Sequence, residues 1–130
     1  VINAGFFEFD ELTSTWDGRR GAFTGDFTDT AMGTEPATLR AMSPIHNLDK
    51  VKVPLLIIHG KADRRTPLAG AKKYVKALKK TDIDFKHHFY KNEGHGLYFD
   101  DNAQDQYEKM QTFLSECDAR QPLNPKVAMR

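Results

Sequence analysis

Two residues of this sequence have the types and the placement that hydrolytic chemistry requires. Asp63 follows the apolar run 55–58, and His95 follows the strand-like run 85–90. A nucleophilic hydroxyl needs a base. A histidine base in turn needs an acid that accepts from its Nδ1–H, fixes its tautomer and stabilises the imidazolium. The sequence therefore offers Asp63 and His95 as a candidate acid and base.

The segments before these two residues must bring them together. The run 55–58 is apolar without alternation, which is typical of a central strand of a parallel sheet with both faces covered. Pro54 stands at the strand entry, where a missing N–H is tolerated. Neighbouring parallel strands lie about 4.8 Å apart, so loops at their carboxyl ends can meet. We therefore expect Asp63 and His95 at one edge of one sheet.

The remaining pattern predicts an α/β fold. We expect strands at 1–4, 53–59 and 84–90, and helices at 10–16, 36–42, 67–80 and 103–117. Residues 18–33 should form a loop. Thr34 or Glu35 should cap the helix 36–42, and Thr66 should cap the helix 67–80 with Pro67 as its first residue. This order predicts about three parallel strands joined by right-handed crossovers, with flanking helices.

Two apolar patterns make more detailed predictions. The last helix should bury a stripe that holds Ala103, Tyr107, Met110, Leu114 and Cys117. The strand 84–90 has one polar face, which indicates a position at or near the sheet edge.

Composition narrows the classes of function. The chain has 130 residues and a net charge of +1, enough for one domain and without a bias towards polyanions. Its lysines at 72, 73, 76, 79 and 80 fit the solvated side of a helix, so we expect no nucleic-acid partner. No apolar run approaches the ~20 residues that span a bilayer. No ligand spacing predicts a metal site, and no glycine-rich phosphate loop predicts a cofactor.

Three segments resemble a known family. They are SPIHNLDK at 43–50, VPLLIIHGKADRRTP at 53–67 and YKNEGHG at 90–96. They are similar to the C-terminal part of the catalytic domain of the prolyl oligopeptidase (S9) family, in its acylaminoacyl-peptidase and dipeptidyl-peptidase-like branch. The resemblance implies a serine peptidase with an α/β-hydrolase fold, with Asp63 as the triad acid and His95 as the triad base. Thr66 stands where the family usually has valine.

The chain departs from that family in one large respect. The family's nucleophile lies in a Gly-x-Ser-x-Gly turn upstream of the acid and the histidine, and this sequence has no such motif. We therefore expect residues 1–119 to be the C-terminal part of the catalytic domain and 120–130 to be a flexible tail. The expected partners are a peptide substrate and either the missing N-terminal part of the domain or a second copy of the chain.

Other interpretations stay open. Asp63 could only cap a turn, and His95 could be an ordinary loop histidine. The chain could be a non-catalytic module that keeps a hydrolase half-fold for binding or assembly. It could also be part of a small-ester or dienelactone-type hydrolase, which has weaker versions of the same motifs. Substrate specificity, compartment and oligomeric state cannot be predicted from the residues.

Overall fold

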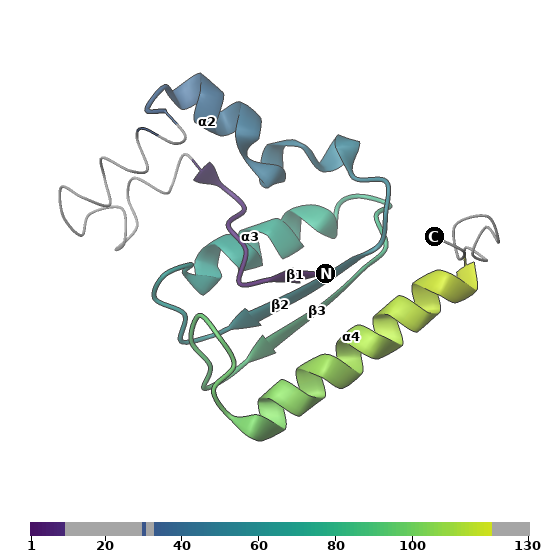
Figure 1. Cartoon of the computed structure of the whole chain (residues 1–130). Helices are drawn as coiled ribbons and strands as arrows, with labels where there is room; N and C mark the ends of the chain where they lie inside the picture. Colours follow the sequence, from purple (N-terminus) through teal and green to yellow (C-terminus); the bar gives the residue numbers. More distant parts are fainter. Residues whose placement is uncertain (10–29, 31–32, 121–130) are drawn as a thin grey trace.

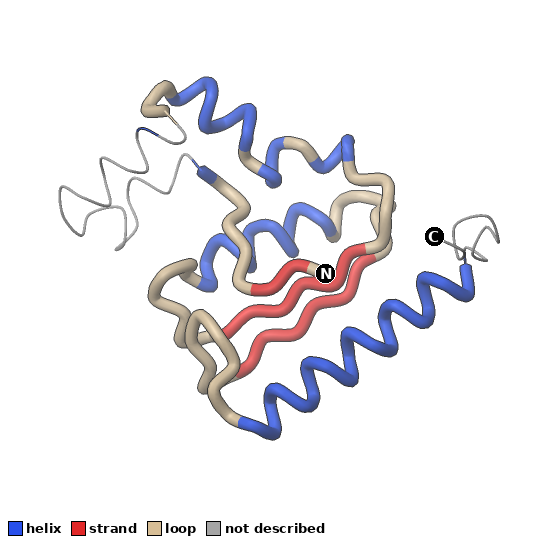
Figure 2. The backbone as a smooth tube through the Cα atoms, in the orientation of Figure 1, coloured by secondary structure: helices blue, strands red, loops and turns tan. Residues whose placement is uncertain are grey.

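Three parallel strands form the centre of the protein. The structure, a computed structural model, describes residues 1–9, 30 and 33–120. The strands β1 (Ile2–Asn3), β2 (Leu55–Gly60) and β3 (Phe85–Tyr90) lie in the order β1-β2-β3. Both pairs are parallel, and Figures 1 and 2 show the three strands side by side. The predicted α/β architecture is thus confirmed, and β3 lies at an edge of the described sheet.

Helices cover both faces of this sheet. The elements outside it are α2 (Pro36–Met42), two short 3-10 turns (Pro44–His46 and Leu48–Lys50), α3 (Leu68–Leu78) and α4 (Asp100–Arg120). In Figure 1, α2 and α3 lie on one side of the sheet and α4 on the other. All six residues of β2 are buried. Its apolar run is unbroken because both faces of this central strand are covered, as the sequence predicted.

Each face has its own apolar core. On the α3 side, Leu55 and Ile57 of β2 pack with Tyr74 and Leu78 of α3, and Phe7 joins them. The ring of Phe7 stacks on Tyr74 with centroids 4.3 Å apart, which fixes the chain that leaves β1. Phe7 is thus buried beside β1 rather than exposed at the sheet edge.

The core on the α4 side differs from the predicted stripe. Leu56 and Ile58 of β2 pack with Tyr90 and with Phe113 of α4, and Met110 and Cys117 lie against them. Tyr107 and Leu114, predicted to face inward, are 68% and 51% exposed. Helical periodicity gives the spacing of an apolar stripe, but α4 has two overlapping stripes with that spacing. Contact with the sheet determines that the stripe with Phe113 is the buried one.

Local signals set the ends of the helices. Glu35 caps α2, its carboxylate accepting from the N–H of Thr38 at 2.7 Å, as one of the two predicted caps. Ser43, which precedes a proline, has extended φ and ψ and ends that helix. At α3 the prediction was wrong: Pro67 is the N-cap residue, and the Thr66 side chain makes no cap bond. That hydroxyl instead binds Asp63.

Other boundaries moved by a few residues. β2 begins two residues later than predicted, and α4 begins three residues earlier and ends three later. The predicted helix 10–16, almost all of the predicted loop 18–33 and the tail beyond residue 120 lie outside the described residues. Within the described ranges, none of the helices combines the length and the apolar character needed to cross a membrane.

Candidate active site

The turn after β2 holds the carboxylate of Asp63 in one orientation. Its Oδ1 accepts from the backbone N–H groups of Arg65 and Thr66, at 2.8 and 2.9 Å. Its Oδ2 accepts from the Thr66 hydroxyl at 2.6 Å. An Asx-type turn of this kind is what a short acidic side chain favours after a strand. Asp63 therefore does cap a turn, and its Oδ2 is bound within this loop by Thr66 while still within reach of the histidine loop.

The histidine predicted as the base meets that oxygen. His95 follows β3, and its Nδ1 lies 3.0 Å from Oδ2 of Asp63. Because a carboxylate only accepts, Nδ1 carries the proton and donates it. The Asp63 side chain is fully buried, whereas 35% of the His95 side chain is exposed. Both hydrogen bonds that the described residues make to the ring involve Nδ1. Nε2, the atom that a reacting hydroxyl would need, takes part in neither.

The surroundings keep Asp63 ionised. Burial would raise the pKa of Asp63, but the hydrogen bonds from Thr66, His95 and the Arg65 N–H outweigh it and hold the pKa below its ordinary value. An ionised acid at neutral pH is the state that can stabilise an imidazolium. The electrostatics of the site therefore suit an acid that orients a histidine base.

A second histidine binds the backbone of the turn that carries Asp63. His59, in β2, is 1% exposed, and its Nε2 lies 2.6 Å from the backbone oxygen of Thr66. Since a carbonyl only accepts, Nε2 carries the proton. The same nitrogen lies 3.6 Å from Oδ2 of Asp63, beyond a good hydrogen bond. His59 thus satisfies a backbone group of the acid loop.

Glu93 anchors the histidine loop and was missed as a site residue. Its side chain is fully buried and accepts from the N–H groups of Tyr98 and Phe99 and from the side-chain amide of Asn102. Burial would raise the pKa of Glu93, but these donors hold it below its ordinary value. The loop that carries His95 is thereby tied to the start of α4. The sequence offered one signal, an acid two residues before the histidine.

The acid loop and the histidine loop are joined through their backbones. The Ala62 N–H donates to the oxygen of Glu93 at 2.9 Å, and the Lys61 N–H donates to the oxygen of Tyr90 at 2.8 Å. A Cβ on Gly60 would lie 2.2 Å from the oxygen of Gly94. Glycine at 60 therefore permits the close approach that brings the two loops together at one end of the sheet (Figure 2).

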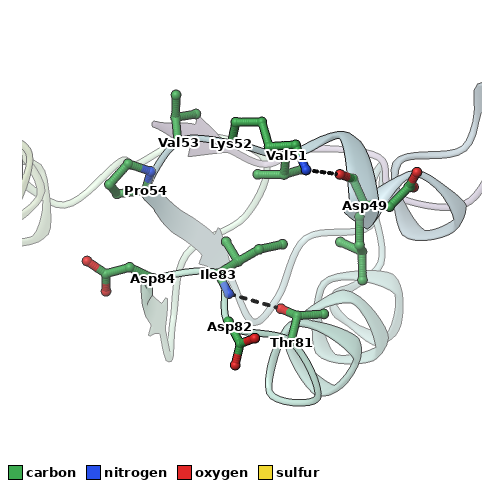
Figure 3. Close-up of a pocket in the computed structure, with 10 residues that line it drawn as sticks. Asp49, Val51, Lys52, Val53, Pro54, Thr81, Asp82, Ile83 and Asp84 are labelled. Atoms are coloured by element: carbon green, nitrogen blue, oxygen red, sulfur yellow. Dashed lines mark hydrogen bonds between the residues drawn. The ribbon is translucent and has the colours of Figure 1, made fainter.

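A cavity lies at the other end of the sheet. It measures about 660 Å³ and is formed by the residues that enter β2 and β3, among them Val53, Pro54, Ile83 and Asp84 (Figure 3). Asp63 and His95 leave the opposite ends of the same strands. Volume alone thus does not locate the candidate site. Among the described residues, no group of three or more acidic, histidine or cysteine side chains is placed to hold a metal ion.

Comparison with known proteins identifies the family. The model of the prolyl oligopeptidase family matches residues 1–120. The chain belongs to the prolyl oligopeptidase family. It is 34% identical over 90 residues to dipeptidyl peptidase family member 6 of Caenorhabditis elegans, covering 68% of this chain and 12% of that protein. It is 33% identical over 82 residues to the acylamino-acid-releasing enzyme of Arabidopsis thaliana, covering 63% of this chain and 10% of that one.

Solved structures of the prolyl oligopeptidase family have the same fold. The acylaminoacyl peptidase of Pyrococcus horikoshii superposes with a TM-score of 0.74 at 21% identity, over 88% of this chain and 19% of that one. Dipeptidyl peptidase 4 of Porphyromonas gingivalis superposes with a TM-score of 0.62 at 25% identity, over 74% of this chain and 14% of that one. The chain thus has part of an α/β-hydrolase fold and spans a small share of the length of these relatives.

Proposed function

We propose that this chain supplies the acid and the base of a serine peptidase whose nucleophile lies in another segment of the catalytic domain. The observation that carries the proposal is the 3.0 Å contact between Nδ1 of His95 and Oδ2 of a buried, ionised Asp63. Membership of a family of serine peptidases supports it.

The geometry suggests how the pair would act. Asp63 holds the proton of His95 on Nδ1, so Nε2 keeps the lone pair. As a serine hydroxyl attacks a peptide carbonyl, Nε2 takes the hydroxyl proton, and Asp63 stabilises the imidazolium. The same proton then passes from Nε2 to the leaving amine. The Gly-x-Ser-x-Gly turn that would supply the serine is absent from this sequence. Neither described serine suits the role, because Ser43 is fully buried and Ser115 lies far along α4.

The proposal includes a partner for β1. Within the described chain β1 pairs only with β2, so its other edge carries unpaired backbone groups. Open edges recruit further strands. The chain spans 12% of one curated relative, and the rest of a catalytic domain is a candidate for that neighbour. A second copy of the chain is the alternative.

The test uses the complete protein that contains this chain. Acylated and dipeptide chromogenic peptides are suitable substrates, because the relatives are named for those activities. We expect Asp63→Asn and His95→Gln each to lower kcat by roughly 10³-fold or more, as loss of a triad member does. Asp101→Asn and His46→Gln make the same chemical changes at exposed positions and serve as controls.

Three outcomes would contradict the proposal. Near-normal turnover in His95→Gln would remove the base assignment. Absence of labelling of the folded complete protein by a fluorophosphonate would favour a binding or assembly module. Turnover of small esters without turnover of any peptide would favour the ester-hydrolase interpretation.

A further inference from the structure

Thr66 makes a contact that the acid–base pair does not require. Its hydroxyl lies 2.6 Å from Oδ2 of Asp63, on the same oxygen that receives His95. It also lies 3.3 Å from Nδ1 of His95. The three atoms form a closed triangle, and Thr66 is 2% exposed, so bulk water does not compete for its hydroxyl.

The direction of the hydroxyl proton follows from charge. Asp63 is ionised, and two oxygens 2.6 Å apart need a proton between them. The hydroxyl therefore donates to Oδ2, and its own lone pairs face Nδ1–H as a second, longer acceptor. A carboxylate offers about four lone-pair sites. Here the N–H groups of Arg65 and Thr66, the hydroxyl and His95 occupy all four.

The position of the hydroxyl is itself fixed. His59 donates to the backbone oxygen of Thr66, and the N–H of Thr66 donates to Asp63. Both backbone groups of Thr66 are thus held while its side chain reaches the site. This is why the residue cannot use its hydroxyl to cap α3, where Pro67 takes the N-cap position.

We propose that Thr66 is a positioning residue which tunes the acid–base pair. With its hydroxyl in place, His95 stays neutral, and so able to accept a proton, at a lower pH than Asp63 alone would allow. The inference rests on the proposed function. The physical reason is competition for Oδ2. The hydroxyl donates to Oδ2 at 2.6 Å, and this short contact outweighs its weaker acceptance from Nδ1–H at 3.3 Å. The charge that Oδ2 shares with the hydroxyl is then not available to stabilise the imidazolium. Removing the hydroxyl would concentrate that charge on His95 and raise its affinity for a proton.

Other polar groups lie near Asp63 and His95, and a substitution of Thr66 leaves their side chains unchanged. His59 approaches from β2, and its proton is committed to the Thr66 backbone. Arg65 approaches from the acid loop through its N–H. The Glu93 carboxylate, on the histidine loop, is committed to three donors on that loop and α4. A shift on losing the Thr66 hydroxyl would therefore arise at Oδ2.

The experiment compares Thr66→Val and Thr66→Ser in the complete protein. Valine keeps the branched shape and loses the hydroxyl, whereas serine keeps it. We expect Thr66→Val to move the acid limb of the kcat/KM profile upward by roughly half to one pH unit, the scale of a lost hydrogen bond to a charged group. Thr66→Ser should restore the wild-type midpoint. Thr112→Val makes the same change at an exposed position on α4 and should leave the profile alone.

A second readout does not depend on turnover. The proton on Nδ1 of His95, held between Oδ2 and the hydroxyl, should give a low-field NMR signal, and ring labelling reports the titration of His95. Both should shift in Thr66→Val and recover in Thr66→Ser. If the complete protein proves inactive, the proposed function fails while this measurement still decides the role of Thr66.

Two results would overturn the inference. One is an unchanged midpoint and an unchanged His95 titration in Thr66→Val. The other is an activity loss that is equal at every pH, which marks a purely structural role. If Thr66→Val does not fold, Thr66→Ala and Thr66→Ser give the same comparison.

Discussion

Buried carboxylates of this protein accept hydrogen bonds from several neighbouring groups. Glu93 is an example, because its carboxylate is fully buried and accepts from Tyr98, Phe99 and Asn102. Replacing Glu93 by alanine would leave those three donors without their acceptor. We expect the free energy of unfolding to fall by roughly 2–4 kcal/mol, as for loss of a buried polar network. Thermal melting of the complete protein measures this loss. Glu108→Ala, at an exposed position of α4, is the control.

The same substitution should also impair turnover. The loop that Glu93 ties to α4 carries His95, so loosening it should displace Nε2 and lower kcat more than it raises KM. Kinetics with the chromogenic peptides separate the two constants. An unchanged melt, or a stable variant with normal kcat, would show that the loop is held by other contacts.

Asp63 and Glu93 should make stability depend on pH. Hydrogen bonds overcome burial and lower the pKa of each below its ordinary value near 4. A carboxylate with a lowered folded-state pKa contributes stability that is present above its unfolded pKa and lost as pH falls through the folded one. We therefore expect the free energy of unfolding to decrease below about pH 5.

Denaturant unfolding of the complete protein over that range measures this slope. Glu93→Gln cannot titrate, so it should show a shallower decrease. Equal slopes in the two proteins would mean that Glu93 keeps an ordinary pKa.

At the scale of elements, the close approach of two loops should depend on Gly60. A Cβ there would lie 2.2 Å from the oxygen of Gly94 and 2.3 Å from that of Glu93. We expect Gly60→Ala to cost roughly 1–3 kcal/mol of stability through overpacking and to lower kcat by separating the loops.

Gly70→Ala is a matched control, since a Cβ at that position of α3 meets nothing within 4 Å. It should stabilise the helix by about 0.5–1 kcal/mol. Melting curves of both variants test the pair. A destabilised Gly70→Ala with a neutral Gly60→Ala would reverse the interpretation.

Elements were predictable from the sequence where one local signal decides them. The apolar run of β2 and the proline after Ser43 each act within a few residues, and both were interpreted correctly. The buried face of α4 depends on the distant sheet, so Tyr107 was misplaced.

The candidate site divides in the same way. Strand order places Asp63 near His95, and that follows from the topology of parallel sheets. The contacts of Thr66 and Glu93 reach across loops, and propensity cannot predict them: the N-cap preference of threonine was overridden by a buried carboxylate.

At the scale of the whole molecule, the chain should be inactive alone. It lacks the nucleophile turn, and of its described serines Ser43 is fully buried and Ser115 lies far along α4. With the serine missing from the triad, hydrolysis should fall to background. A fluorophosphonate probe should label the complete protein and leave the isolated chain unlabelled. Stoichiometric labelling of Ser14, Ser43 or Ser115 in the isolated chain would contradict this expectation.

We expect the isolated chain to associate with other chains, because part of the catalytic domain is missing from it. The free edge of β1 and several large exposed side chains, Val1, Tyr98, Phe99, Tyr107 and Leu114, leave backbone and apolar surface uncovered. Unpaired strand edges associate with other chains, and large apolar patches mark interaction sites. We therefore expect the isolated chain to self-associate in light scattering and to bind an apolar dye, and we expect co-expression with the N-terminal part of the catalytic domain to suppress both. A monomer at high concentration, with a cooperative melt and no dye binding, would mean that β1 needs no neighbour. The 130 residues would then fold as a unit without the rest of the domain.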